Sequence, residues 1–341
     1  MQLKKAIAIM SGMGVATAVS AGNLTSATGD ITFSGGATAG YFYNTKTGSN
    51  KTDSIEVPDV SLNFSSDAKA RGLGFNVVTG RSQTPTIMQP SPSPAAAGAL
   101  SSSPEGFNVF VADFSVAPVA NLTLNIGKLP TNIGYEIAPT FANPNVLLGA
   151  VWAMQPVTYP GARATYNLGA AQVYAEVNKD TSTNGTGASV LGVMTSLKGV
   201  NLTASYYNAY NGRNIVDVIA SYSMDAISFA ANIDYHTLDT SIQTAGNATK
   251  ATGMAFYVTP KMGKIALPVR VESLSDGTSG IYGVDNGYSV TVTPTYSLSD
   301  SAFVRAEVAY VKSKNKLFIG KDGVTPADTR MAGSVSLGVK F

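Results

Sequence analysis

The chain has no cysteine, a single histidine and little charge. Without Cys, its 341 residues can form neither disulfide bonds nor thiolate metal sites. Charged residues make up 13% of the chain, about half the share usual in soluble domains. The net charge is +2 and no basic cluster stands out, which argues against a nucleic-acid partner. With one His and no Cys, we expect no metal ion and no other cofactor.

The chain also lacks a long apolar run. After its first residues no stretch of about 20 apolar residues occurs, so no transmembrane helix is available. The start is basic at Lys4 and Lys5 and apolar over Ala6–Val19, and a small-residue site ends at Ala21. This order is typical of a signal peptide over residues 1–21, cleaved after Ala21, with an uncleaved helical anchor as the less favoured alternative. Residues 22–341 then form the mature domain.

What the chain has instead is period-two alternation, clearest in its last residues. From Met331 to Phe341, apolar side chains occupy the odd positions from Val335 on, and small or polar ones occupy the even positions. Such alternation suits a strand with hydrocarbon on one side and water on the other. A terminal Phe that closes such a strand resembles the C-terminal signature of bacterial outer-membrane β-barrels. The edge strand of an ordinary β-sandwich is the alternative.

About sixteen segments have this strand-like character, and none has a sustained helical period. Gly, with 34 residues, is spread along the whole length, which disfavours helices. We therefore predict an all-β fold, a transmembrane antiparallel β-barrel of about 16 strands. The expected strands are Asp30–Asn44, Ser54–Ser66, Ala70–Arg81, Gly106–Ala117, Ala120–Leu129, Val157–Asn167, Gly169–Asn178, Gly187–Lys198, Val200–Tyr210, Asn214–Met224, Ala226–His236, Lys250–Pro260, Lys264–Ser275, Asn286–Ser297, Ser301–Lys312 and Arg330–Phe341.

The connections between these segments alternate in length. Long ones such as Ser82–Glu105 and Pro130–Pro156 take turns with short ones such as Pro118–Val119 and Gly199. Outer-membrane barrels have short turns on the periplasmic side and longer loops outside. The exception is Asn211–Arg213, which falls in the long series although it is brief. A β-sandwich gives no reason for this sorting.

Strand parity assigns one face of each segment to water. Most charged residues of the expected strands lie opposite the apolar positions of their own strand, because Arg or Lys at the lipid midplane costs about 2–4 kcal/mol. The side chains expected to point into the lumen are Asp59, Asp113, Arg163, Glu176, Asp217, Asp234, His236, Arg270, Glu272, Arg305, Glu307 and Lys340. Tyrosines near strand ends fit aromatic girdles at the two membrane interfaces. They are Tyr41, Tyr43, Tyr166, Tyr210, Tyr222, Tyr235, Tyr288, Tyr296 and Tyr310.

The third long connection, Pro130–Pro156, is the most informative one. It is apolar, holds the only Trp of the chain, Trp152, and carries a single charge, Glu136. A loop this long in a compact fold is usually functional or disordered, and this one is too apolar to be disordered. We expect it to fold into the lumen, where its apolar side chains find cover. A loop packed over the barrel mouth or against a neighbouring subunit is the alternative.

The stretch from Leu122 to Tyr166 contains LNIGKLPTNIGYE, an Asn-Pro turn and QPVTYPGARATY. It resembles the OmpL-like family of β-barrel porins. The shared pattern is a strand ending in Gly-Lys/Arg, then Ile-Gly-x-Glu, an Asn-containing loop and Pro-x-Thr-x-x-Gly-x-Arg. The resemblance is specific over this stretch and architectural elsewhere. The matching positions are Gly127, Lys128, Ile133, Gly134, Glu136, Asn143, Pro156, Gly161 and Arg163.

The resemblance implies a bacterial outer-membrane porin. Its function would be a water-filled pore for passive diffusion of small hydrophilic solutes and ions, and its partners would be outer-membrane lipid and those solutes. A structural or adhesive barrel with working surface loops and a plugged lumen is the alternative. Whether three barrels associate as a homotrimer is left open. We expect no enzyme, because the only His, His236, is expected at the rim of its strand, two residues after Asp234.

Within this pore, one set of residues is expected to line or constrict the lumen. It consists of Glu136, Arg163, Glu176, Asp217, Asp234, Arg270, Glu272, Arg305 and Glu307. Glu136 and Arg163 are expected to form an ion pair that holds the long connection against the barrel wall. The alternative is that each faces water unpaired.

Overall fold

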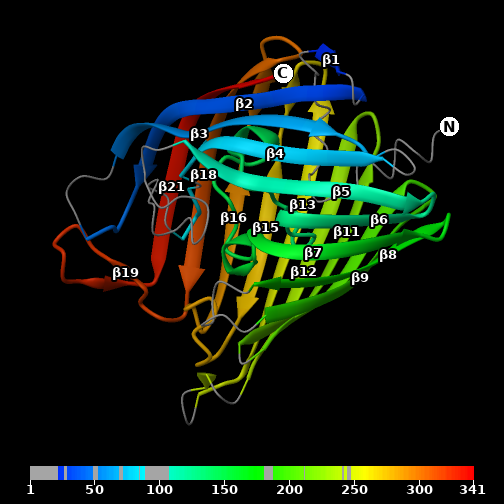
Figure 1. Cartoon of the computed structure of the whole chain (residues 1–341). Helices are drawn as coiled ribbons and strands as arrows, with labels where there is room; N and C mark the ends of the chain where they lie inside the picture. The colour runs from blue at the N-terminus through cyan, green and yellow to red at the C-terminus, as the bar shows by residue number, and fades with distance from the viewer. Residues whose placement is uncertain are drawn as a thin grey trace.

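The chain folds into a closed antiparallel β-barrel of sixteen strands, seen in a computed structural model (Figure 1). The structure describes residues 22–26, 29–48, 53–68, 72–83, 85–88, 107–179, 187–210, 212–239, 242–243 and 247–341, with side chains from residue 31 on. The signal peptide expected over residues 1–21 and most of the connection 83–106 lie outside these residues. No helix in the described part of the chain is long and apolar enough to span a membrane.

All sixteen predicted strands are present, with ends within three residues of the predicted ones. Two of them are each split into two pieces, β14 with β15 and β16 with β17. The strands of the ring are β2 Gly29–Asn44, β3 Asp53–Ser66, β4 Leu73–Ser82, β5 Asn108–Val119, β6 Leu122–Pro130, β7 Thr158–Asn167, β8 Ala171–Lys179, β9 Gly187–Leu197, β10 Val200–Ala209, β11 Arg213–Ser223, β12 Ile227–Leu238, β13 Lys250–Met262, β14 Ile265–Ala266, β15 Val269–Ser275, β16 Asn286–Val292, β17 Thr295–Ser297, β18 Ala302–Ser313 and β21 Thr329–Lys340.

Proline explains the two split strands. Pro268 separates β14 from β15, and Pro294 separates β17 from β16. Proline has no N–H to donate to the neighbouring strand, so the ladder is interrupted there. Each proline still accepts through its carbonyl: Thr293 N–H donates to Pro268 O at 2.9 Å, and Ala306 N–H donates to Pro294 O at 3.0 Å. The barrel wall therefore stays continuous across both interruptions.

The last strand closes the ring, as the alternation of its residues suggested. β21 pairs with β18 on one side and with β2 on the other. Phe341 extends this pairing by one residue, since its N–H donates to Gly35 O at 3.0 Å and its O accepts from Gly35 N–H at 2.9 Å. Two short pairs lie outside the ring: β1 (Gly22–Ser26) pairs with β2, and β19 (Phe318–Ile319) pairs with β20 (Pro326–Ala327). Because β2 pairs with both β3 and β21, the ring formed by the described strands has no first or last strand with a free edge.

The connections alternate in length as predicted. The connections after β3, β5, β7, β9, β11, β13 and β17 have six residues or fewer, whereas those on the other end include 131–157, 276–285 and 314–328. The brief connection 210–212 remains the exception in the long series. This sidedness is the one that outer-membrane barrels have.

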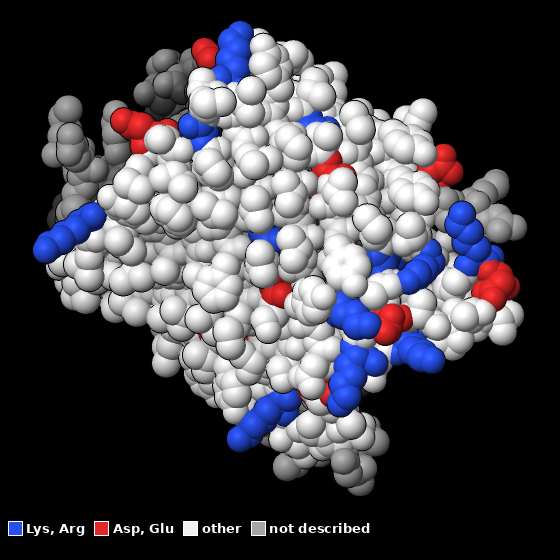
Figure 2. Space-filling model, turned by 180° about the vertical axis from the view of Figure 1, so that it is seen from behind, with Lys and Arg blue, Asp and Glu red and all other residues white. Residues whose placement is uncertain are grey.

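The outer face of the barrel is apolar. In β18 the exposed positions include Val304 and Val308, and between them Arg305 and Glu307 are buried. All nine tyrosines predicted for the girdles are exposed or partly exposed. Figure 2 shows one side of the wall as a broad uncharged surface, with most Lys, Arg, Asp and Glu gathered toward its edges. Such a surface is suited to contact with lipid.

A charge placed on this outer face should destabilise the barrel. Val308 lies near the middle of β18 and is 56% exposed. Val308→Arg is expected to lower the free energy of unfolding by about 2–4 kcal/mol, because it puts a guanidinium near the centre of the hydrocarbon. Denaturant unfolding in lipid vesicles measures this loss.

The matched control is Val324→Arg. Val324 is 79% exposed and lies in the connection between β19 and β20, outside the ring. A surface substitution there should change the free energy of unfolding by less than about 0.5 kcal/mol. Equal losses at the two positions would mean that Val308 does not face hydrocarbon.

Candidate functional site: the β6–β7 segment

The connection between β6 and β7, residues 131–157, is called the β6–β7 segment. It contains two single-turn 3-10 helices, η1 (Thr140–Ala142) and η2 (Trp152–Met154), and otherwise has no regular structure. Most of its backbone N–H and C=O groups therefore lack the partners that a helix or strand provides. Where those groups find partners decides where the segment lies.

Local side chains hold the first turns of the segment. Ile137 N–H donates to Asn143 Oδ1 at 2.9 Å, which brings the start of the segment close to the end of η1. Gly134 has a φ of +92°. A Cβ at Gly134 would lie 2.0 Å from Gln155 Oε1, so both the conformation and the space require glycine. Asn143, Gly134 and Gln155 are thus three polar or small residues that shape an otherwise apolar stretch.

Two buried carboxylates of the barrel wall accept from the segment's backbone. Glu307 on β18 accepts from Val146 N–H at 2.6 Å and from Leu147 N–H at 2.8 Å, one oxygen to each. Glu272 on β15 accepts from Val151 N–H at 2.9 Å. Hydrogen bonds to an ionised acceptor are about twice as strong as neutral ones. The two carboxylates thus fix the second half of the segment to β15 and β18, which are separated by β16.

A buried arginine of the wall, in contrast, donates hydrogen bonds to backbone carbonyl groups of the segment. Arg305 on β18 donates through Nη1 to Thr140 O at 3.1 Å and to Asn143 O at 2.9 Å. Its guanidinium also lies 4.7 Å from the centre of the Phe303 ring. Wall carboxylates therefore bind N–H groups of the segment, and this wall guanidinium binds its C=O groups.

The single charge of the segment, Glu136, pairs with Arg270 on β15. Its Oε1 accepts from Arg270 Nη1, and its Oε2 accepts from Gly149 N–H at 2.7 Å. Arg270 also donates to Leu147 O at 2.8 Å and to Thr291 Oγ1 at 3.1 Å. Burial raises the pKa of Glu136 to about 7, while the positive charge of Arg270 acts in the opposite direction. The pair joins both halves of the segment to one wall residue.

The segment contacts strands on opposite sides of the ring. Thr140 N–H donates to Asp59 Oδ2 on β3 at 3.1 Å, and Gly134 N–H donates to Asp217 Oδ2 on β11 at 3.4 Å. β3 and β11 are eight strands apart in either direction around the sixteen-strand ring. The acceptors in both contacts are fully buried side chains. The two contacts lie only six residues apart in the chain.

Uncharged polar residues complete these contacts. Gln155 Nε2 donates to Asn232 Oδ1 at 2.9 Å and to Asp234 Oδ2 at 2.8 Å. Asn232 in turn donates to Asp217 Oδ1 at 2.5 Å, so it links two carboxylates on β11 and β12. Asn145 Nδ2 donates to Thr293 Oγ1 at 2.6 Å. The sequence analysis did not single out Gln155, Asn145 or Asn232. The sequence feature that could have identified them is an amide side chain within an apolar connection or on the polar face of an alternating strand.

The expected ion pair between Glu136 and Arg163 is wrong. Arg163 on β7 pairs with Glu176 on the adjacent β8, with Nε to Oε2 at 2.6 Å, and the two residues are direct register partners. Its Nη2 donates to Pro130 O at 2.6 Å, at the end of β6. Arg163 therefore binds the chain at the point where the segment leaves β6. These hydrogen bonds go to Glu176 and Pro130 on the adjacent strands, and not to Glu136.

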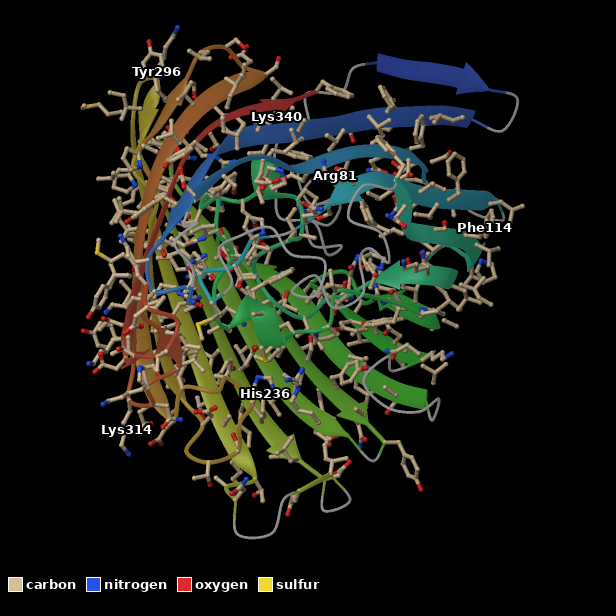
Figure 3. The ribbon with its side chains drawn as sticks, turned by 90° about the vertical axis from the view of Figure 1, so that its left-hand side faces the viewer. Arg81, Phe114, His236, Tyr296, Lys314 and Lys340 are labelled. Atoms are coloured by element: carbon tan, nitrogen blue, oxygen red, sulfur yellow. The ribbon has the colours of Figure 1, made fainter. Side chains whose placement is uncertain are left out.

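His236 is also placed differently from the expectation of a rim residue. It is fully buried, and Nε2 lies 2.9 Å from the hydroxyl of Tyr282, in the connection after β15, and 3.7 Å from Asp234 Oδ2. Figure 3 shows the labelled His236 and Arg81 within the ring, and Phe114 and Tyr296 at its outside. Among the described residues, no group of three or more His, Asp or Glu is placed to hold a metal ion.

The remaining residues expected on the lumen face lie on the inner side of the strands. Asp59, Asp113, Glu176, Asp217 and Asp234 are buried, as are Arg270, Glu272, Arg305 and Glu307. Arg163 and Lys340 are partly exposed. The buried ones alternate along their strands with the exposed apolar positions. Most of them are bonded to the β6–β7 segment or to each other.

Fold and site together define a membrane β-barrel of the porin type. Residues 30–341 match the family model "Putative beta-barrel porin-2, OmpL-like", and the chain belongs to this family. The family and the fold are those of outer-membrane porins, which are not enzymes. No curated protein matches the chain.

Solved structures of porins have the same fold. The in-vitro folded OmpT, an outer membrane protein of Vibrio cholerae, is 12% identical with a TM-score of 0.62, over 94% of this chain and 100% of that chain. A trimer form of the same protein is 11% identical with a TM-score of 0.59, over 91% and 99%. A mutant of the Rh. blastica porin is 17% identical with a TM-score of 0.55, over 91% and 100%.

The partner of Glu136 can be tested with a double-mutant cycle. At alkaline pH, well above the pKa of about 7, Glu136 is ionised. Glu136→Gln and Arg270→Gln should then each lower the free energy of unfolding, and the double variant should recover about 1–3 kcal/mol of the summed loss, because each single change leaves a buried charge unpaired. Denaturant unfolding of the four proteins gives the coupling.

The matched control is the cycle between Glu136→Gln and Arg163→Gln. The two losses in free energy of unfolding should add to within about 0.5 kcal/mol, because Glu136 pairs with Arg270 whereas Arg163 pairs with Glu176. Coupling in this second cycle and additivity in the first would restore the pairing that the sequence suggested.

Proposed function

We propose that the barrel is a water-filled pore for passive diffusion of small hydrophilic solutes and ions, narrowed by the β6–β7 segment inside the lumen. The observation that carries the proposal is the bonding of this segment to inner-face side chains on opposite strands, Asp59 on β3 and Asp217 on β11. A segment that reaches both within six residues spans the barrel interior. Family membership supports the same function.

The charged inner face supports a polar lumen. A barrel filled only by apolar packing would have no reason to place Arg270, Arg305, Glu272 and Glu307 inward. Irregular backbone at membrane depth is stable only where protein or water satisfies its polar groups. These four side chains provide such partners, so the segment can occupy the interior without unsatisfied backbone.

A second function has its own support. Arg270, Glu272, Asp217 and Asp234 are completely buried rather than facing open water. That burial favours a barrel whose lumen is plugged by the segment and whose surface loops perform a structural or adhesive role. The two functions differ in whether the wild-type barrel conducts.

Export and assembly complete the proposal. The chain carries a signal peptide over residues 1–21, and the mature barrel resides in the outer membrane, as its family does. One solved neighbour, OmpT of Vibrio cholerae, has a trimer form. We extend this to the chain as a homotrimer in lipid.

Planar-bilayer recording decides between the two functions. The wild-type barrel should conduct in discrete steps, and replacement of residues 132–154 by a short Gly-Ser linker should raise the step size, because the constriction is removed. Deletion of 321–324, exposed residues between β19 and β20, is the control and should leave the step size unchanged.

Each other outcome has a clear meaning. A silent wild-type barrel with a conducting linker variant would establish the plugged barrel. Equal steps in the wild-type and linker proteins would place the segment outside the conducting path. Silence of both would end the pore proposal.

The signal peptide has a separate test. Intact mass of the protein extracted from the outer membrane should correspond to a chain beginning at Gly22, since cleavage is expected after Ala21. A mass that includes residues 1–21 would support the uncleaved anchor.

A further inference from the structure

A cavity of about 100 Å³ lies between the β6–β7 segment and the wall formed by β3, β4 and β5. Elsewhere around the ring, the segment is hydrogen-bonded to β15 and β18 through Glu272 and Glu307. Most of the cavity lining is apolar, with Val78, Phe110 and Trp152 among its residues. Apolar walls with a few polar groups are the usual composition of small-molecule sites.

Three polar atoms in the cavity lining have no hydrogen-bond partner among the described residues. They are Asp59 Oδ1, Ser82 Oγ and Thr158 Oγ1. Asp59 and Ser82 are register partners on β3 and β4, and Thr158 begins β7. All three side chains are at least nine-tenths buried, with exposed fractions of 0%, 3% and 7%. Buried polar atoms are almost always paired, so three unpaired ones at one cavity indicate a missing partner.

Of the three side chains, Asp59 has the strongest need for a hydrogen-bond donor, because it is a buried carboxylate. Its other oxygen, Oδ2, accepts from both the N–H and the hydroxyl of Thr140, so Oδ1 alone is left. A buried carboxylate oxygen without a donor is costly, and a charge-assisted donor is its strongest partner. Ser82, the register partner of Asp59 on β4, adds a hydroxyl that can accept from the same donor group, whereas Thr158 on β7 is separated from β3 by three strands.

The unpaired carboxylate oxygen of Asp59, and not the net charge of the lining, favours a cation. Asp59 and Glu136 contribute two carboxylates, and Arg81 contributes one guanidinium. Glu136 is already bonded to Arg270, which is not part of the lining. With that pair set aside, Asp59 and Arg81 balance each other, so the preference for a cation rests on the unpaired Oδ1 of Asp59.

We propose that this cavity binds a small organic ammonium ion, with its –NH₃⁺ group at Asp59 and Ser82 and its apolar body against Val78, Phe110 and Trp152. The volume of the cavity limits the size of the apolar part of the ligand. A cavity of about 150 Å³ accommodates benzene, so this smaller one suits a chain of about four carbons. The site does not depend on conduction through the barrel, because a plugged barrel would hold the same cavity.

The test uses three probes of equal length: n-butylammonium, 1-butanol and butyrate. Calorimetric titration of the detergent-solubilised wild-type protein should show saturable binding of n-butylammonium, with 1-butanol at least about tenfold weaker, since one charge-assisted hydrogen bond corresponds to about that factor. Butyrate should not bind. Because Trp152 is the only Trp and lines the cavity, its fluorescence should change with the same midpoint.

Two variants locate the site. Asp59→Asn keeps the size of the side chain but removes its charge, and should weaken n-butylammonium about tenfold or more while leaving 1-butanol unchanged. Ala138→Leu keeps the charge and fills the cavity from the segment side, so it should abolish binding of both. The matched control is Asp113→Asn, a buried inner-face carboxylate on β5 that does not line the cavity, and it should change neither affinity.

The results that overturn the proposal are specific. Equal affinities for n-butylammonium and 1-butanol would reduce the cavity to an apolar space without cation recognition. Failure of all three probes to bind the wild-type protein would assign the unpaired atoms to water. Loss of binding in Asp113→Asn as large as in Asp59→Asn would move the site away from this cavity. If Asp59→Asn does not fold, the comparison of the three probes and Ala138→Leu still decides the outcome.

Discussion

The rest of the structure depends on one constraint: the irregular backbone of the β6–β7 segment needs hydrogen-bond partners on the barrel wall. A strand ring satisfies its own N–H and C=O groups through its neighbours, but the β6–β7 segment has no such ladder. Glu307 and Glu272 accept its N–H groups, and Arg305 and Arg270 donate to its C=O groups. Charges on the inner wall are thus structural partners of the backbone as well as components of a polar interior.

This constraint explains why the inner charges come as both signs on adjacent positions. In β18, Arg305 and Glu307 lie two residues apart on one face, and in β15, Arg270 and Glu272 do the same. An irregular segment presents donors and acceptors alternately, so a wall with both signs can satisfy both. A wall of one sign would leave half of the segment's polar groups unpaired and would repel itself.

Under the same constraint, the contacts of the segment differ between two sides of the ring. On the side of β11 to β18 the segment and the wall are joined by buried hydrogen bonds and apolar packing. On the side of β3 to β5 fewer bonds reach the wall, and the cavity with its unpaired polar atoms lies there. Any solute path or ligand site is therefore expected on the second side, where the wall is not already occupied by the segment.

The sequence by itself determined the ring. The two-residue period is a local property of a strand. The sequence alone therefore assigns Arg305 and Val304 to opposite faces of their strand, without knowledge of the neighbouring strands. Loop sidedness and strand number follow from the same local pattern, and the motif around Glu136 and Arg163 indicated the family. Only the tertiary structure decided which charges pair. Several arginines point inward, and the choice of Arg270 for Glu136, 134 residues further along the chain, depends on which strands the irregular segment contacts. No periodicity specifies that position, because it is set by the sum of many backbone contacts with different strands.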